Sequence, residues 1–159
     1  MNPDAKFAFT HPAHAIALGF GAGLSRYAPG TFGTLLGWGM GLLLLGPQPG
    51  WAELGALAAA FLIGVWACSV TGRHLGVADH GAMVWDEVVA FLLVLAVLPK
   101  TLAWQAAGFV LFRVFNILKP PPIRALERRF HGGFGVMADD LLAAGYTLLC
   151  LSIAKRMFF

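Results

Sequence analysis

Largely apolar stretches of eleven to nineteen residues alternate with short polar segments along most of the chain. The longest, 54–72, contains no charged residue and is followed by Arg73 and His74. Because about 20 apolar residues cross a bilayer as a helix, this stretch is typical of a membrane-spanning segment. Four more such stretches cover 32–46, 88–98, 101–118 and 141–154. The pattern predicts an all-α fold: a compact integral membrane helical bundle with four or five short membrane helices.

The N-terminal part of the chain has a weaker pattern. The segment 11–25 is mildly apolar and rich in glycine and alanine, but too short and broken to span a membrane. It is predicted to form an interfacial or re-entrant helix. Residues 1–10 contain Asp4 and Lys6 without an apolar core, so no cleavable signal peptide is expected.

The composition agrees with a membrane protein. Hydrophobic residues make up 58% of the 159 residues and charged residues 12%, against about 45–50% and about 25% in soluble domains. The mean hydropathy is +0.74. The length fits a single domain, 1–159. A net charge of +3 gives no indication of a nucleic-acid partner. Cys68 and Cys150 lie in apolar stretches and are expected to be packing residues rather than a disulfide or metal pair.

The distribution of charge predicts an orientation in the membrane. If each of the five apolar stretches crosses once, the polar segments 26–34, 73–87 and 113–140 lie on one face. That face carries eight of the eleven Lys and Arg residues and seven of the eight acids. Basic residues collect on the cytoplasmic side of membrane proteins. We therefore expect one active site on the cytoplasmic face, at the level of the lipid headgroups.

Two pairs of acids stand directly before apolar stretches, Asp86-Glu87 and Asp139-Asp140. Four carboxylates brought together repel one another unless a cation neutralises them, and oxygen ligands together with water suit Mg²⁺. The hypothesis is a magnesium site formed by these four residues. The alternative is that Asp and Glu occur there because they stabilise the first turn of a helix.

Basic and amide side chains supply a complementary group. Arg113, Asn116 and Lys119 are spaced three residues apart, so on a helix they share one face. Arg can bind a phosphate through two hydrogen bonds, and Lys can bind it as a point charge. Arg113 lies in membrane-like surroundings, where a charge is costly and usually functional. These three are candidate phosphate-binding residues, whereas Arg128 and Arg129 are better explained as snorkelling side chains.

Four sequence blocks follow one another between about residue 19 and about residue 145. They are Ala28-Pro-Gly-Thr-Phe-Gly-Thr34, Val84-Trp-Asp-Glu-Val-Val89, Phe112-Arg-Val-Phe-Asn-Ile-Leu-Lys-Pro-Pro-Pro-Ile123 and Gly132-Gly-Phe-Gly-Val-Met-Ala-Asp-Asp140. Each block alone is weakly specific, but the four in order resemble the phosphatidylglycerophosphatase A family. The resemblance implies a Mg²⁺-dependent enzyme of the bacterial inner membrane. Its expected reaction is hydrolysis of the phosphate monoester of phosphatidylglycerophosphate to give phosphatidylglycerol.

The resemblance also implies site residues at matching positions. It nominates Asp86, Glu87, Asp139 and Asp140 as acidic site residues, Arg113, Lys119 and Thr31 near the phosphate, and Asp79 as a further acid. One departure is Asn116, where the family usually has Asp. Asn keeps an oxygen that can bind a metal but lacks the negative charge and any general-base role. Whether water attacks the phosphorus directly or an aspartate forms a phospho-enzyme stays open.

The alternative from another class is a small non-catalytic membrane protein, such as a transporter subunit or an assembly factor. Such a protein would carry ionisable residues near the middle of its spans, and 54–72 and 141–154 contain none. An alcohol phosphotransferase of phospholipid synthesis would need a spaced Asp-Gly, Ala-Arg and Asp signature, which is absent. The pattern therefore favours the lipid phosphatase.

Overall fold

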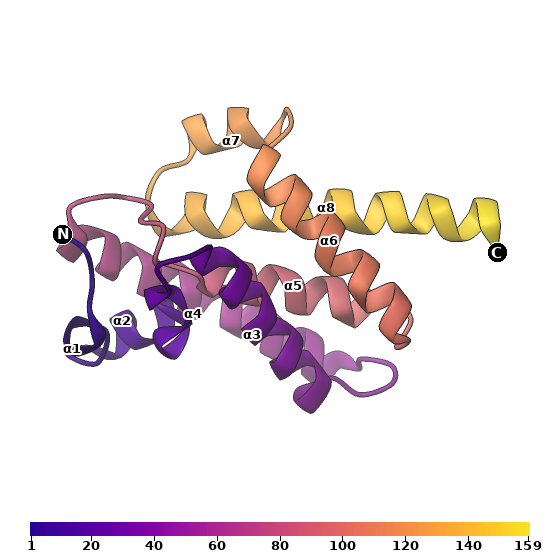
Figure 1. Cartoon of the computed structure of the whole chain (residues 1–159), viewed down its shortest axis with the longest axis horizontal. Coiled ribbons are helices and arrows are strands. Elements are labelled where there is room, and N and C mark those ends of the chain that lie inside the picture. The colour runs from indigo at the N-terminus through magenta and orange to yellow at the C-terminus, as the bar shows by residue number, and fades with distance from the viewer.

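The computed structural model describes all 159 residues, and every regular element in it is helical. Figure 1 shows α8 running along the long axis of the molecule, with the N-terminus and the C-terminus at opposite ends. In chain order the elements are α1 (Ala5–Ala8), α2 (Pro12–Ala17), η1 (Gly19–Leu24), α3 (Pro29–Leu44), α4 (Trp51–Leu75), α5 (Trp85–Val97), α6 (Leu102–Leu118), α7 (Ile123–Arg129) and α8 (Gly132–Phe158). The predicted all-α fold is confirmed.

Two helices, α4 and α8, are long and apolar enough to cross a membrane. They contain 25 and 27 residues, whereas α3, α5 and α6 contain 16, 13 and 17. A span needs about 20 residues, so the three shorter helices fall below that length. The sequence predicts four or five membrane helices, which is more than these two. In α5 the apolar character has another cause, since eleven of its residues are buried among neighbouring helices.

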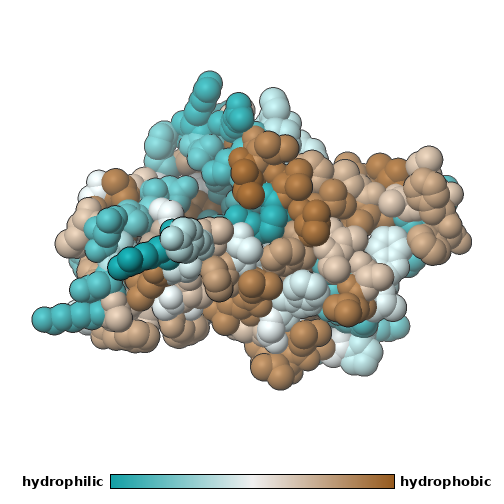
Figure 2. Space-filling view, viewed as in Figure 1, coloured by the Kyte–Doolittle hydropathy of each residue, from teal (hydrophilic) through white to brown (hydrophobic).

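The long helices leave much apolar surface uncovered. Only 22% of the most apolar part of α4 is buried within the molecule, and 44% of that of α8. Figure 2 shows hydrophilic residues gathered around α7 and the N-terminal end, while the half nearer the C-terminus is largely hydrophobic. Leu43, Leu62 and Leu149 are exposed on α3, α4 and α8. A continuous apolar surface is typical of contact with lipid or with a partner protein.

The centre of the bundle is α5, with α3, α4 and α8 packed around it. On one side α3 comes close because glycines line its contact face, and a β-carbon at Gly37 would lie 2.9 Å from the backbone of α5. On another side Phe91 packs against Phe112 of α6, with ring centroids 5.7 Å apart. Asp86 and Glu87 lie in the first turn of α5, which begins at Trp85. The central position of the helix therefore buries their carboxylates inside the bundle.

The N-terminal segment 11–25 forms two short helices, α2 and η1, of six residues each. Three residues of η1, Gly19, Phe20 and Gly21, have positive φ, which interrupts a single helix. His14 fixes α2 to the end of α4. Its ring is buried, with Nδ1 2.9 Å from the Thr71 hydroxyl and Nε2 3.0 Å from Nδ1 of His74. Six helical residues extend only about 9 Å. The segment is therefore a folded cap on α4 in place of the single interfacial or re-entrant helix predicted.

Two helices begin earlier than the hydrophobic pattern predicts. The apolar stretches begin at residues 32 and 141, whereas α3 begins at Pro29 and α8 at Gly132, so the segments 28–34 and 131–136 largely form the first turns of these helices. Asp139 and Asp140 consequently lie two turns inside α8 instead of at its start. The seven-residue helix α7, which the sequence pattern does not predict, packs against α8.

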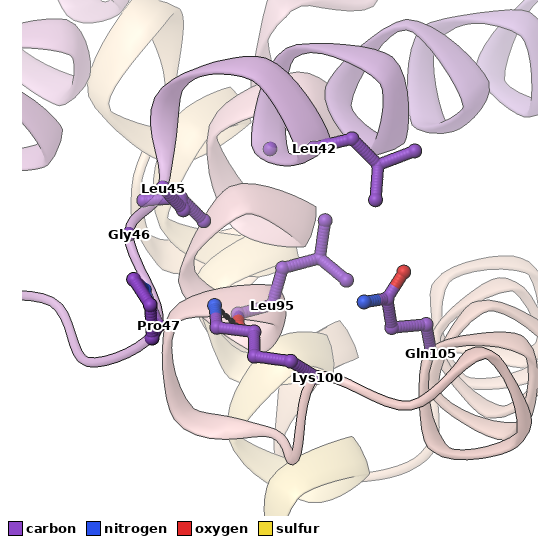
Figure 3. Close-up of a pocket in the computed structure, with 8 residues that line it drawn as sticks. Leu42, Leu45, Gly46, Pro47, Leu95, Lys100 and Gln105 are labelled. Carbon is purple, nitrogen blue, oxygen red and sulfur yellow. Dashed lines mark hydrogen bonds between the residues drawn. The ribbon is translucent and has the colours of Figure 1, made fainter.

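The end of α5 remote from its acids is closed by a lysine. The Nζ of Lys100 donates a hydrogen bond of 2.9 Å to the carbonyl oxygen of Leu95 (Figure 3). A cation satisfies the carbonyls at a helix C-terminus and suits the helix dipole. The adjoining cavity of about 270 Å³ is lined by no carboxylate. The amide oxygen of Gln105, which also lines it, accepts a hydrogen bond of 2.7 Å from Trp38. Both polar side chains that line this cavity are therefore already paired.

Candidate metal and phosphate site

Three buried carboxylates from two helices meet where α5 begins. Asp86 and Glu87 lie in the first turn of α5, and Asp140 lies in the third turn of α8. One oxygen of each lies within 4.8 Å of the others. The exposed fractions of the three residues are 6%, 9% and 3%. These three residues are termed the inner cluster.

The inner cluster carries more negative charge than the protein around it balances. Asp86 Oδ1 and Glu87 Oε2 are buried and accept no hydrogen bond. The cation that reaches the cluster is Arg113 of α6, whose Nη1 lies 3.7 Å from Glu87 Oε1. Buried carboxylates without donors or a close cation are costly. A donor set of carboxylate oxygens is what Mg²⁺ prefers, so these residues fit a divalent cation.

Arg113 has unused hydrogen-bonding capacity of its own. Its Nε and Nη1 atoms are buried and donate to no acceptor in the protein. The start of α3 lies against it, where a β-carbon on Gly30 would come within 3.0 Å of Arg113 Nη1 and 2.5 Å of Glu87 Oε1. Glycine is the residue that permits this approach. A guanidinium beside the start of a helix is an arrangement that binds phosphate.

Asn116 is committed to the inner cluster. Its Nδ2 donates a hydrogen bond of 2.7 Å to Asp140 Oδ2, and the side chain is buried. The sequence predicts that Asn116 contacts the phosphate, but the structure places it against a carboxylate. An amide at this position supplies a donor that orients Asp140, and it spares the cluster a fourth negative charge.

A second group of carboxylates, termed the outer cluster, contains Asp79, Glu127 and Asp139. One oxygen of each again lies within 4.8 Å of the others. Lys119 completes this group, since its Nζ lies 3.0 Å from Asp139 Oδ2 and 3.0 Å from Glu127 Oε1. Burial by itself lowers the pKa of Lys119, but Asp139 and Glu127 together raise it above its ordinary value. The side chain therefore stays an ammonium ion, and the outer cluster has an internal cation.

The structure thus separates the four acids that the sequence places in one magnesium site. Successive residues of a helix point about 100° apart. That rotation sends Asp140 to the inner cluster and Asp139 to the outer one. Arg113 and Asn116 lie on α6 as predicted, but Lys119 ends that helix with a positive φ and turns toward the outer cluster. Thr31 is half-buried in the first turn of α3, one residue after Gly30.

Glu127 is the site residue that the sequence pattern misses. It lies on α7 with 46% of its side chain exposed, within the run Leu-Glu-Arg-Arg. A single acid among exposed bases is typical of a solvated surface, and no spacing relates it to the other acids. Only the packing of α7 against α8 brings it to Lys119.

Sequence comparison decides which family this geometry belongs to. The family model described as phosphatidylglycerophosphatase A matches residues 15–155, which include both clusters. The chain belongs to the phosphatidylglycerophosphatase A family. The resemblance carried by the four sequence blocks is therefore confirmed.

Curated relatives support the same assignment. A phosphatidylglycerophosphatase A of Haemophilus influenzae is 45% identical over 150 residues, covering 93% of this chain and 91% of the relative. The phosphatidylglycerophosphatase A of Escherichia coli K12 is 39% identical over 142 residues, covering 87% and 80%. A protein of Bacteroides thetaiotaomicron, named for a phosphatidylinositol-3-phosphatase activity, is 37% identical over 147 residues, covering 88% and 91%. No match to the chain was found among solved structures.

Proposed function

We propose that this protein is a Mg²⁺-dependent lipid phosphatase. It hydrolyses the phosphate monoester of phosphatidylglycerophosphate to give phosphatidylglycerol, at the cytoplasmic face of the bacterial inner membrane. The observation that carries the proposal is the inner cluster, three buried carboxylates with two unpaired oxygens beside an arginine with unused donors. Membership of the family supports the substrate, since relatives from two bacteria carry that name.

The inner cluster supplies the ligands for magnesium. Asp86, Glu87 and Asp140 would hold the ion, which when bound makes a coordinated water more acidic and neutralises charge on a phosphoryl oxygen. Asn116 keeps Asp140 in position through its hydrogen bond. A carboxylate oriented by a neighbouring hydrogen bond would hold the ion more tightly than a free one.

Arg113 binds the phosphate of the substrate. Its free Nε and Nη1 donors are held between Glu87 and Gly30, at the start of α3. Phosphate oxygens can accept hydrogen bonds from the guanidinium and from the Gly30 N–H, which has no acceptor in the protein, and Thr31 adds a hydroxyl. The fixed positive charge stabilises the negative charge that spreads over the phosphoryl oxygens during transfer. Lys119 lies in the outer cluster, where its positive charge balances the carboxylate of Asp139.

The proposed location follows from surface and charge. The apolar surfaces of α4 and α8 face the bilayer, and α3, α5 and α6 complete the bundle at membrane depth. The end that holds both clusters also carries most of the basic residues, which favours the cytoplasmic side.

Single cysteines test this orientation. They are placed at Arg128 and at Gln48 in a protein whose Cys68 and Cys150 are replaced by alanine. A membrane-impermeant thiol reagent should label Gln48→Cys in intact cells and Arg128→Cys only after permeabilisation. The reverse result would place the site outside.

The activity is tested by phosphate release from phosphatidylglycerophosphate in detergent micelles, with Mg²⁺ or with EDTA. We expect release that needs Mg²⁺ and that Asp86→Asn and Asp140→Asn abolish. Glu53→Gln is the matched control, because it makes the same acid-to-amide change at the far end, where Glu53 caps α4. No release by folded wild type contradicts the proposal. If the Asn116→Asp variant then also releases no phosphate, the result favours the non-catalytic alternative, a transporter subunit or assembly factor.

One relative favours a second substrate. The Bacteroides protein is named for phosphatidylinositol 3-phosphate, and it shares 37% identity with this chain. Both lipids carry a phosphate monoester on a polyol, and a phosphodiester joins that polyol to diacylglycerol. The inner cluster and Arg113 fit the phosphate monoester of either. The ratio of kcat/KM for the two lipids, measured on the same preparation, decides between them.

A further inference from the structure

A cavity of about 690 Å³ is used by none of the steps above. It opens between the N-terminal residues, the loop before α3 and the loop before α5. Five of its eleven lining residues carry polar or charged side chains: Asn2, Asp4, Ser25, Arg26 and His80. It therefore suits an occupant that carries polar groups.

Two residues that line the cavity are bonded to residues of the sites described above. Pro29 lines it and is bonded to Gly30, which lies against Glu87 and Arg113 of the phosphate site. On the other side His80 lines it and is bonded to Asp79 of the outer cluster. A molecule whose phosphate occupies the site therefore has the cavity as the adjoining hydrophilic space.

The lining groups suit an anion linked to a polyol. Arg26 forms no ion pair in the protein, so its guanidinium is free to bind an anion. The Nδ1 of His80 accepts the Ala82 N–H at 3.1 Å, which makes Nε2 the N–H donor of the neutral ring. The acid in the lining, Asp4, is already engaged, because its Oδ1 accepts the Phe7 N–H at 2.7 Å.

We propose that this cavity is the headgroup subsite, which receives the polyol and the phosphodiester that lie beyond the phosphate monoester of the lipid. Arg26 binds the phosphodiester anion, and the Nε2–H of His80 donates to a polyol hydroxyl. The inference rests on the proposed function and deepens it, since it names the residues that select among lipid phosphates. Phosphatidic acid has neither group, because its phosphate is attached directly to diacylglycerol.

The test compares kcat/KM for phosphatidylglycerophosphate and for phosphatidic acid in mixed micelles with Mg²⁺. Wild type should prefer phosphatidylglycerophosphate, and Arg26→Ala should lower the ratio of the two values about tenfold, the loss expected for one hydrogen bond to a charged group. His80→Gln should lower the ratio in the same direction, mainly through KM. Arg26→Lys keeps the charge and should recover part of the ratio.

Arg156→Ala is the matched control, since it removes an exposed arginine at the far end of α8. It should leave the ratio at the wild-type value. A ratio unchanged in both Arg26→Ala and His80→Gln, or equal losses on the two lipids, would overturn the subsite while leaving the phosphatase intact. A wild type that hydrolyses neither lipid would overturn the proposed function first, and the subsite with it.

Discussion

The inner and outer clusters each gather three carboxylates within the same 4.8 Å limit, yet the surrounding protein treats them differently. In the outer cluster Lys119 forms two ion pairs of 3.0 Å, and two of the three acids reach solvent. In the inner cluster all three acids are buried, and Arg113 stands 3.7 Å from one of them. The protein completes one cluster with its own cation and leaves the other incomplete.

This difference indicates which of the two clusters binds a ligand. An acidic group that only holds helices together gains stability from a nearby lysine, as the outer cluster does. Burying three carboxylates without such a partner lowers the stability of the fold, and proteins accept that cost mainly where chemistry requires it. The inner cluster is therefore the better candidate for the metal centre. The outer cluster is better explained as an electrostatic support that fixes α7 and Lys119.

The comparison is tested most strongly by removing one carboxylate from each cluster. Asp86→Asn removes a ligand from the inner cluster, and we expect hydrolysis of phosphatidylglycerophosphate to fall about a thousandfold. Glu127→Gln changes an exposed acid, and we expect the rate to stay within about threefold of wild type. Turnover at saturating Mg²⁺ measures both. Equal losses would show that the two clusters act as one centre.

The same pair of variants gives opposite expectations for stability without metal. Asp86→Asn relieves repulsion among buried carboxylates, so the Mg²⁺-free protein should be more stable than wild type by about 2 kcal/mol. Glu127→Gln should be slightly less stable. Thermal unfolding in detergent with EDTA measures the difference, and added Mg²⁺ should stabilise wild type but not Asp86→Asn. A Mg²⁺-free Asp86→Asn protein less stable than wild type would contradict an unbalanced inner cluster.

Removing the internal cation should turn the outer cluster into an unbalanced one. Lys119→Met leaves Asp139, which is 3% exposed, without its ion pair. The expected loss is about 3 kcal/mol of unfolding free energy, because one partner of a buried pair is left alone. Lys155→Met, an exposed lysine near the C-terminus, is the control and should stay within about 0.5 kcal/mol. Chemical or thermal unfolding measures both, and similar values would show that Lys119 is not the balancing charge.

Adding a single carbon atom to α3 is enough to disturb its close approach to the inner cluster. Gly30→Ala adds a β-carbon 2.5 Å from Glu87 Oε1 and 3.0 Å from Arg113 Nη1, which must then separate. A displacement of this kind costs about a hundredfold in turnover. Gly39→Ala lies on the same helix with nothing within 4 Å, and should stabilise the protein by about 0.5–1 kcal/mol without lowering kcat. Normal turnover in Gly30→Ala would remove Arg113 from the proposed mechanism.

The smallest expected effect comes from adding a charge to the inner cluster. Asn116→Asp loses the 2.7 Å hydrogen bond to Asp140 and places a fourth carboxylate beside it. Without Mg²⁺ the variant should be about 1 kcal/mol less stable than wild type. The Mg²⁺ concentration for half-maximal activity should fall by about threefold, because a further anionic oxygen strengthens cation binding. A higher Mg²⁺ requirement would show that the amide donor matters more than the charge.

Much of this arrangement can be predicted from the sequence because the informative residues are rare in so apolar a chain. Asp86 and Glu87 stand at the start of a helix as their position before an apolar stretch suggests, and both enter the inner cluster. Arg113 stands out in the sequence because a charge is costly in apolar surroundings, and it is the cation that reaches these acids. The general chemistry of the site follows from residue type and order alone.

What the sequence leaves out depends on contacts between distant segments. The start of α8 is obscured by three glycines near it, Gly132, Gly133 and Gly135, since glycine is a poor helix former. Gly133 is nonetheless helical, and its N–H donates to Ser69 Oγ of α4 at 3.1 Å. That earlier start fixes the rotation that separates Asp139 from Asp140. In the same way, Glu127 becomes part of the outer cluster only because Lys119 and α8 hold α7 in place.

The shortness of α5 has a consequence for how the enzyme meets its lipid. Thirteen residues of helix extend about 20 Å, against a hydrocarbon core of about 30 Å. The helices α3, α4 and α8 enclose α5, so in the bilayer proposed for this protein its length sets how deep the carboxylates lie and leaves the surrounding lipid unchanged. A helix of this length leaves about 10 Å of the hydrocarbon core unspanned, which places the start of α5 at or below the headgroup level of one leaflet. A substrate lipid then reaches the reaction centre without rising out of its leaflet.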